Sequence, residues 1–218
     1  TSPESDDMNR YVLYGEGDPK KLLSRLYFWT WNTQEVLDMI TWMRQWNSTA
    51  PPSQRVQFLG FDMQSPGASM DSVAAFIARV DPANSEFLND RFACILPFRN
   101  HFQAPGQQAT VYAARDTATK AACAAGLQSV YDLIAGNRAT YARAEPNAFE
   151  AMLHHARLVQ QFEAMIAVAY NAGLSSFARD KAMAENVGWI RDHAPVGAKI
   201  ALWAHNGREL FYISGNKM

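Results

Sequence analysis

The 218-residue sequence has only two cysteines, no excess of either charge and no long apolar run. Cys94 and Cys123 lie far apart and form no C-x-x-C pair, so we expect two separate buried thiols, without a disulfide framework or a zinc knuckle. Lysine and arginine total 20 against 21 acidic residues, which gives no electrostatic reason to expect nucleic acid or an anionic membrane as a partner. No apolar run approaches the roughly 20 residues of a membrane helix, and no signal peptide opens the chain. These absences predict a cytoplasmic protein.

Two common hydrolase motifs are missing as well. The nearest match to G-x-S-x-G, Gly67-Ala-Ser69-Met-Asp71, lacks the second glycine and the preceding strand, which disfavours a serine hydrolase. His-Glu-x-x-His is absent, which disfavours a common zinc arrangement. His154 and His155 are neighbours on a predicted helix and point about 100° apart, so they cannot bind one ion from the same face. We expect them at the surface or rim, and we expect no metal or other cofactor.

Helical periodicity dominates what is present. A hydrophobic fraction of 48% with 12% aromatics indicates a packed core, and the length suits one domain. Apolar residues at helical spacing predict helices near residues 33–46, 69–80, 83–96, 110–135, 147–171 and 175–193. The two long helices within 110–171 predict an α-hairpin that could cap a substrate pocket.

Two short apolar runs interrupt the helical pattern and predict strands near residues 55–61 and 198–204. The expected fold class is therefore α/β: mostly helical, with a small parallel or mixed central sheet covered by helices. Asp62 and Gln64 follow the first run, and His205 and Asn206 follow the second. Because ligands bind at the carboxyl edge of such sheets, we expect Asp62 and His205 to face one crevice.

Each of these residues also has a structural interpretation. His205 could be a buried, hydrogen-bonded histidine that closes a strand. Asp62 and Gln64 could hold the following turn through hydrogen bonds to its backbone. The preceding helix carries Arg179, Glu185 and Asn186, which could reach the crevice, although charges such as Arg179 are often simply solvated.

Several spaced motifs resemble the erythromycin esterase family, in the same order and from about Tyr11 to Arg208. They are Trp31-x-Thr33-x-Glu35-Val36, Trp42-x-Arg44-x-x-Asn47, Gly60-Phe-Asp62-Met-Gln64, Arg179-Asp180-x-x-Met183-Ala-Glu-Asn186-x-x-Trp189 and Trp203-Ala-His-Asn206. The resemblance implies an α/β hydrolase-like activity on ester or lactone bonds of a small molecule, best known for opening macrolide rings.

The sequence departs from that family in two places. An N-terminal Gly-Glu-x-x-His-Gly block is missing, and Arg208 stands where a second histidine usually follows the Trp-Ala-His-Asn block. Arginine does not deprotonate at ordinary pH, so Arg208 can hold an anion but cannot act as a base. We therefore expect a single domain over residues 1–218, truncated at both ends, with a helical hairpin insertion at about 110–171.

The resulting functional hypothesis assigns His205 as the base that activates water. Asp62 or Glu185 would orient it, and Arg179 or Arg208 would stabilise the developing oxyanion. The amides of Asn206, Asn186 and Gln64 complete the expected substrate contacts. The alternative is a catalytically inactive binding or scaffold domain of the same family.

Overall fold

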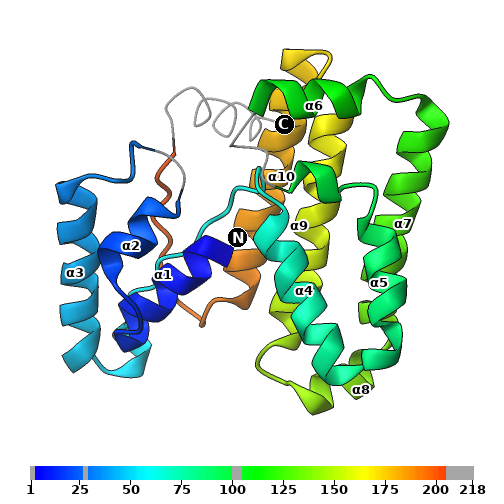
Figure 1. The fold of residues 1–218 in the computed structure, drawn as a ribbon. Coiled ribbons are helices and arrows are strands. Elements are labelled where there is room, and N and C mark those ends of the chain that lie inside the picture. Colours follow the sequence, from blue (N-terminus) through cyan, green and yellow to red (C-terminus); the bar gives the residue numbers. More distant parts are fainter. Residues whose placement is uncertain (1–2, 27–28, 100–104, 205–218) are drawn as a thin grey trace, which may run out of the picture.

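A computed structural model describes residues 3–26, 29–99 and 105–204, and nearly all of its regular structure is helical (Figure 1). The α-helices are α1 (Pro3–Tyr14), α2 (Pro19–Ser24), α3 (Gln34–Thr49), α4 (Gly67–Val80), α5 (Ser85–Phe92), α6 (Pro105–Ala113), α7 (Thr117–Gly136), α8 (Arg138–Ala144), α9 (Phe149–Ala167) and α10 (Ala172–His193). Short 3-10 helices are η1 (Pro52–Gln54), η2 (Pro82–Asn84) and η3 (Leu96–Phe98). None of the helices within these ranges is long and apolar enough to cross a membrane.

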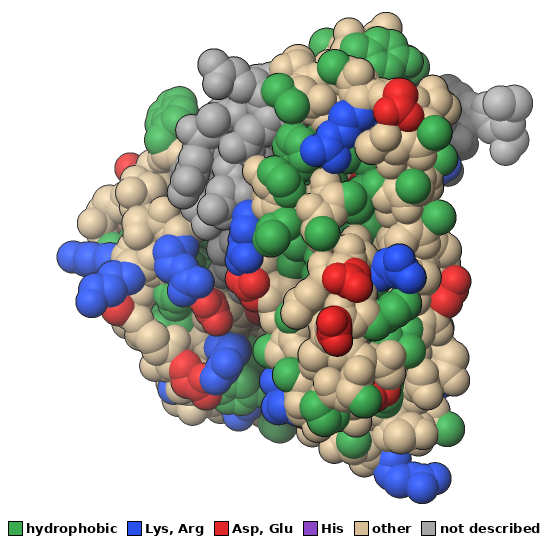
Figure 2. All heavy atoms as spheres, turned by 45° about the vertical axis from the view of Figure 1, so that its right-hand side comes forward, with side chains coloured by type: hydrophobic (Ala, Val, Ile, Leu, Met, Phe, Trp, Pro, Cys, Tyr) green, Lys and Arg blue, Asp and Glu red, His purple; other side chains and the backbone are tan. Residues whose placement is uncertain are grey.

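The helices form two packed groups with separate cores (Figure 1). Helices α1, α2 and α3 enclose a small core that includes Met8, Val12 and Ile40. Helices α4 to α10 form a larger bundle in which α9 packs against α4, α7 and α10. The apolar stripe of α9, with Phe149, Val159 and Phe162 completely or almost completely buried, explains its central position. On the face shown in Figure 2, side chains of both signs are interspersed.

The predicted central sheet is wrong, because the described residues contain no strand. Residues 55–62 are extended, but side-chain amides take the place of a neighbouring strand. Asn47 pairs with Val56 in both directions, accepting from its N–H at 2.8 Å and donating to its carbonyl oxygen at 2.8 Å. Asn9 accepts from the N–H of Phe58 at 2.9 Å. The N–H and carbonyl groups of Val56 and the N–H of Phe58 are thus satisfied without a β-ladder.

The second predicted strand, residues 198–204, also lacks a strand partner among the described residues. Its larger side chains are not buried on both faces as expected, since Ile200, Leu202 and Trp203 are 42%, 47% and 53% exposed. Trp203 instead packs edge-on against Trp31, with ring centroids 4.7 Å apart. This contact brings the end of the described chain beside the segment that leads into α3.

The mostly helical character is confirmed, and the differences at helix ends follow from capping. Thr33, the first residue of the helix predicted near 33–46, is instead its cap: its side chain accepts from the N–H of Val36, and α3 begins at Gln34. Asp116 accepts from the N–H of Thr119 at 2.8 Å and starts α7 there. The single long helix predicted from residue 110 is therefore divided into α6 and α7.

The expectation of two separate thiols is wrong, because Cys94 and Cys123 form a disulfide with their Cα atoms 5.8 Å apart. The bond links the chain just after α5 to α7, two helices that also pack together. Disulfides persist in oxidising compartments and are rare in the cytoplasm. This bond therefore weighs against the predicted cytoplasmic location.

The expectation of surface histidines on α9 is also wrong, since His154 and His155 are 4% and 2% exposed. His155 lies between α1 and α4, with Nε2 3.2 Å from the Asp6 carboxylate and Nδ1 3.3 Å from the Ser69 hydroxyl. It ties the first helix to the bundle. Ser69 is itself only 1% exposed, so this serine is closed to substrate.

Candidate active site

An ion pair joins Asp62 to Arg179, two residues that are 117 positions apart in the sequence. Arg179 Nε donates to Asp62 Oδ1 at 3.0 Å, and Nη2 donates to Oδ2. The N–H of Met63 also donates to Oδ1, at 2.8 Å. The side chains of Arg179 and Asp62 are only 15% and 31% exposed, so the pair lies largely inside the protein. The structure thus fixes the Asp62 carboxylate at the end of the extended segment and does not leave Arg179 solvated.

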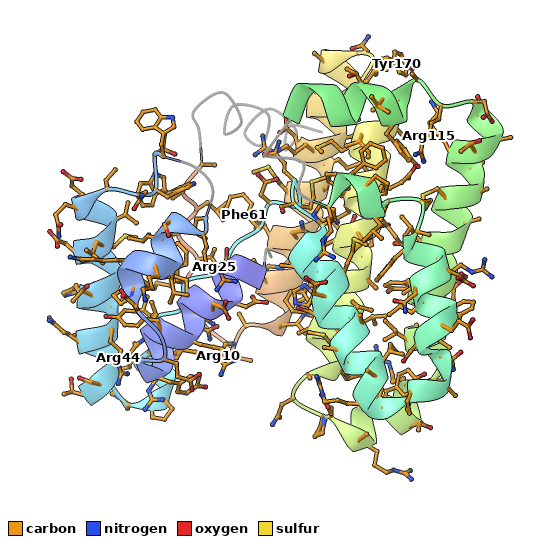
Figure 3. All side chains as sticks on the ribbon, viewed as in Figure 1. Arg10, Arg25, Arg44, Phe61, Arg115 and Tyr170 are labelled. Carbon is orange, nitrogen blue, oxygen red and sulfur yellow. A yellow bond between two sulfur atoms is a disulfide. The ribbon has the colours of Figure 1, made fainter. Side chains whose placement is uncertain are left out.

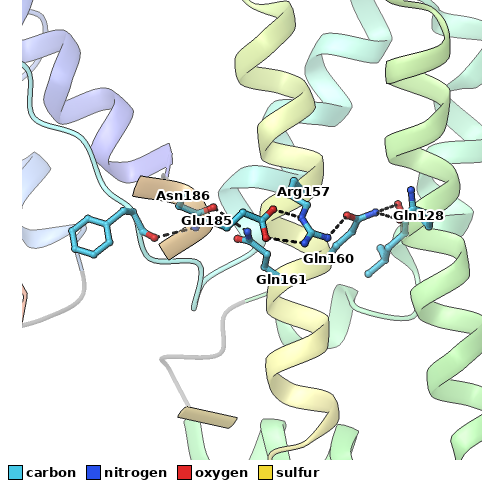
Figure 4. Close-up of polar contacts among 8 residues, drawn as sticks. Gln128, Arg157, Gln160, Gln161, Glu185 and Asn186 are labelled. Atoms are coloured by element: carbon cyan, nitrogen blue, oxygen red, sulfur yellow. Dashed lines mark hydrogen bonds and ion pairs between the residues drawn. The ribbon is translucent and has the colours of Figure 1, made fainter. Parts of the chain in front are cut away.

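A chain of buried amides holds the residue before Asp62. Asn186 donates to the carbonyl oxygen of Phe61 at 3.0 Å, and its own oxygen accepts from Gln161 at 3.0 Å (Figure 4). Asn186 is completely buried. Phe61 lies on the segment between the two helix groups (Figure 3). Asn186 therefore positions the segment that carries Asp62, by connecting it to α9 and α10.

Glu185, the neighbour of Asn186, turns toward a different partner (Figure 4). Its oxygens accept from Nε and Nη2 of Arg157 at 2.6 and 2.9 Å. Hydrogen bonds from the Arg157 guanidinium hold the pKa of Glu185 below its ordinary value. The structure therefore places Asp62, Arg179 and Asn186 together and directs Glu185 toward α9.

Of the remaining predicted site residues, the structure describes only Gln64. Gln64 lies half-buried in the bend just after Asp62. His205, Asn206 and Arg208 lie outside the described residues. The described chain approaches them through Trp203, next to Trp31.

Two residues of this region, Gln161 and Arg157, were not identified from the sequence. Gln161 is 4% exposed and sits between Leu158 and Met165, at helical spacing within the apolar stripe of α9. A buried glutamine must find a hydrogen-bond partner. A glutamine within an apolar stripe therefore indicates a buried polar contact, and the sequence does show that pattern at Gln161. Its Oε1 atom is buried without a partner among the described residues. Arg157 gave no comparable signal, because its partner comes from another helix.

The chemistry open to the Asp62 carboxylate follows from its partners. An ionised carboxylate offers about four lone-pair positions, and Arg179 and the Met63 N–H use three hydrogen bonds. One position is left for a further donor, such as an imidazole N–H. The Arg179 guanidinium lies against the carboxylate and balances its charge.

The sequence and fold both match known proteins. The family model described as "Erythromycin esterase" matches residues 2–208. A putative hydrolase of Bacillus subtilis (strain 168), YbfO, is 23% identical, with 90% of this chain and 45% of the relative covered. The chain thus spans about half the length of this curated relative.

Two solved structures share the fold. One is titled a succinoglycan biosynthesis protein, with a TM-score of 0.71, 19% identity, and coverage of 94% of this chain and 47% of that chain. The other is a mutant of the erythromycin esterase EreC in its open conformation, with a TM-score of 0.66, 16% identity, and coverage of 94% and 51%. Because the family model spans nearly the whole sequence, the chain belongs to the erythromycin esterase family.

Proposed function

We propose that this chain supplies part of the active site of a hydrolase that cleaves ester or lactone bonds in a small molecule. One observation carries the proposal: motif residues from separate parts of the sequence meet in space. Asp62 binds Arg179, the carbonyl of Phe61 binds Asn186, and Trp31 contacts Trp203. Trp203 precedes His205 by two residues, so the histidine follows directly from a segment held by these contacts.

The proposed reaction uses His205 as a general base. Its imidazole removes a proton from water while the water oxygen bonds to the carbonyl carbon of the substrate. The carbonyl oxygen becomes an oxyanion, which Arg208 and the amides of Asn206 or Gln64 would stabilise. The bond to the leaving oxygen then breaks as His205 returns the proton to it. Asp62 would accept from the imidazole N–H and orient the ring.

The alternative is a domain that binds or supports another part of a larger protein without catalysing hydrolysis. The chain spans less than half of its curated relative, so activity of the whole protein is part of the proposal. The missing Gly-Glu-x-x-His-Gly block favours this alternative for the 218-residue chain alone. We expect little or no esterase activity from that chain by itself.

Kinetics on a longer protein distinguish the two possibilities. Hydrolysis of erythromycin and of p-nitrophenyl butyrate would be compared between the 218-residue chain and a version extended through the upstream coding sequence. His205→Ala in the active version should lower kcat about 100- to 10,000-fold, as expected for a general base. His193→Ala is the matched control, because its half-exposed ring lies at the far end of α10. Absence of activity in the extended protein, or full activity in His205→Ala, would refute the proposal.

A further inference from the structure

A pocket of about 410 Å³ lies against α9, between α7 and α10. Its volume is within the range of about 300–1,000 Å³ usual for small-molecule sites. The lining residues come from all three helices: Gln128, Tyr131, Leu153, His154, Arg157, Gln160, Glu185 and Trp189. Glu185 belongs to this pocket, whereas its neighbour Asn186 belongs to the candidate active site. The two sites therefore use different faces of α10.

The lining of the pocket carries one positive and one negative side chain, so it has no net charge. Arg157 and Glu185 are the ionised residues among its lining, and they bind each other through two hydrogen bonds of 2.6 and 2.9 Å. Burial lowers the pKa of His154 to about 2, so its ring is neutral at physiological pH. A charged ligand would have to compete with this formed ion pair, whose side chains are 40% and 41% exposed. The pocket therefore suits an uncharged ligand.

The polar wall of the pocket is already ordered. Arg157 Nη1 donates to Gln160 at 3.0 Å, and Gln160 Nε2 donates to Gln128 at 3.0 Å (Figure 4). Gln128 in turn donates to Asp132 at 2.9 Å. Each glutamine carbonyl has a second lone pair, and the Gln128 amide has a second hydrogen. The wall thus presents fixed donors and acceptors side by side, at little further entropy cost on binding.

The aromatic part of the lining is also held in place. The Trp189 ring stacks on His154, with centroids 4.1 Å apart and planes 8° apart. It also stacks on His193, at 4.1 Å and 24°. Leu153 and the ring of Tyr131 add further apolar surface. The Nε2 atom of His154 is buried and has no hydrogen-bond partner among the described residues, so this part of the bundle retains unused hydrogen-bonding capacity.

We propose that this pocket binds a neutral polyhydroxylated ligand of the sugar class. Hydroxyl groups both donate and accept, which matches the alternating amides of Gln128 and Gln160 and the phenol of Tyr131. The C–H groups of a sugar ring match the apolar atoms of Tyr131 and Leu153 in the same lining. Neither the pocket nor the sugar carries a net charge in this pairing. This binding does not depend on hydrolysis at Asp62 and His205.

Saturation-transfer NMR on the full chain tests the proposal. The probes are methyl α-D-glucopyranoside and maltose at millimolar concentrations, with sodium acetate and methylammonium chloride as charged competitors of similar or smaller size. We expect saturation transfer to the sugars and none to the two ions. Gln160→Ala should weaken sugar binding about fivefold, the equivalent of one lost hydrogen bond.

Two further variants locate the binding. Tyr131→Phe removes only a hydroxyl and should also weaken sugar binding. It replaces Gln160→Ala in the test if that variant fails to fold. Gln45→Ala, at an exposed position of α3 in the other helix group, is the matched control and should bind as the unchanged protein does. No transfer to either sugar, binding of acetate in preference to the sugars, or equal sugar binding in all variants would each overturn the proposal.

Discussion

Replacing Arg179 by methionine tests the pairing on which the candidate site depends. The substitution keeps an unbranched apolar stem but removes both hydrogen bonds to Asp62. Breaking a fully buried ion pair costs about 3–5 kcal/mol, because the remaining charge stays buried. Asp62 is 31% exposed and retains the N–H of Met63, so water and the backbone offset part of this cost. We expect a loss of about 2–3 kcal/mol in the free energy of unfolding.

Urea unfolding and thermal melts provide the assay. A loss of this size in a chain of this length corresponds to a fall in melting temperature of about 5–10 °C. Arg191→Met is the matched control on the same helix: its pair with Asp192 is 71% and 60% exposed, so the change should stay within about 0.5 kcal/mol. The double variant Asp62→Asn with Arg179→Met should lose less than the sum of the single variants. Equal effects of Arg179→Met and Arg191→Met, or simple additivity, would refute the reasoning.

Three further predictions concern the bundle. Burial raises the pKa of Glu163, which accepts from the Tyr112 hydroxyl at 2.6 Å. The folded state therefore holds this proton more tightly than the unfolded state, and the associated stability is complete below about pH 4.3 and lost as pH rises through the raised pKa. Glu163→Gln should consequently gain stability relative to the unchanged protein as pH rises, in urea unfolding at a series of pH values; a difference independent of pH would contradict this. The disulfide spans 29 residues, for which loop entropy gives about 3.5 kcal/mol. Joint replacement of Cys94 and Cys123 by alanine should lower the free energy of unfolding by about that amount, and a loss below about 1 kcal/mol would contradict the loop model. Asn186→Leu should cost about 2–4 kcal/mol, because the part-buried carbonyl of Phe61 and the buried amide of Gln161 lose their partner; an unchanged melting temperature would show that the amide chain is not needed.

The helices could be predicted from the sequence because their apolar spacing is local. The stripe of α9 depends on residues within a few positions of one another. The cap at Asp116, which divides the long helix predicted from residue 110, was not foreseen. Local patterns do not settle whether a sheet forms, because a strand needs a partner from elsewhere in the chain. An apolar run such as residues 55–61 fits a strand, but only the folded chain shows that Asn47 and Asn9 occupy its backbone groups.

The sequence indicated individual residues of the candidate site but not which of them form pairs. Asp62, Arg179 and Asn186 were all expected near one crevice, and the structure brings them together. Glu185 was expected with them, yet one step along a helix rotates a side chain by about 100°, and this step directs Glu185 to Arg157. The disulfide was missed because a separation of 29 residues carries no sequence pattern of its own.

The position of the His205 ring relative to Asp62 tests the proposed site most directly. A crystal structure of the longer protein with a bound ester analogue would measure it. We predict an imidazole nitrogen within hydrogen-bond reach of the Asp62 carboxylate, at about 2.6–3.2 Å or through one water, with the other nitrogen facing the analogue. An imidazole packed away from Asp62, with the Asp62–Arg179 pair closed to the analogue, would contradict a shared site.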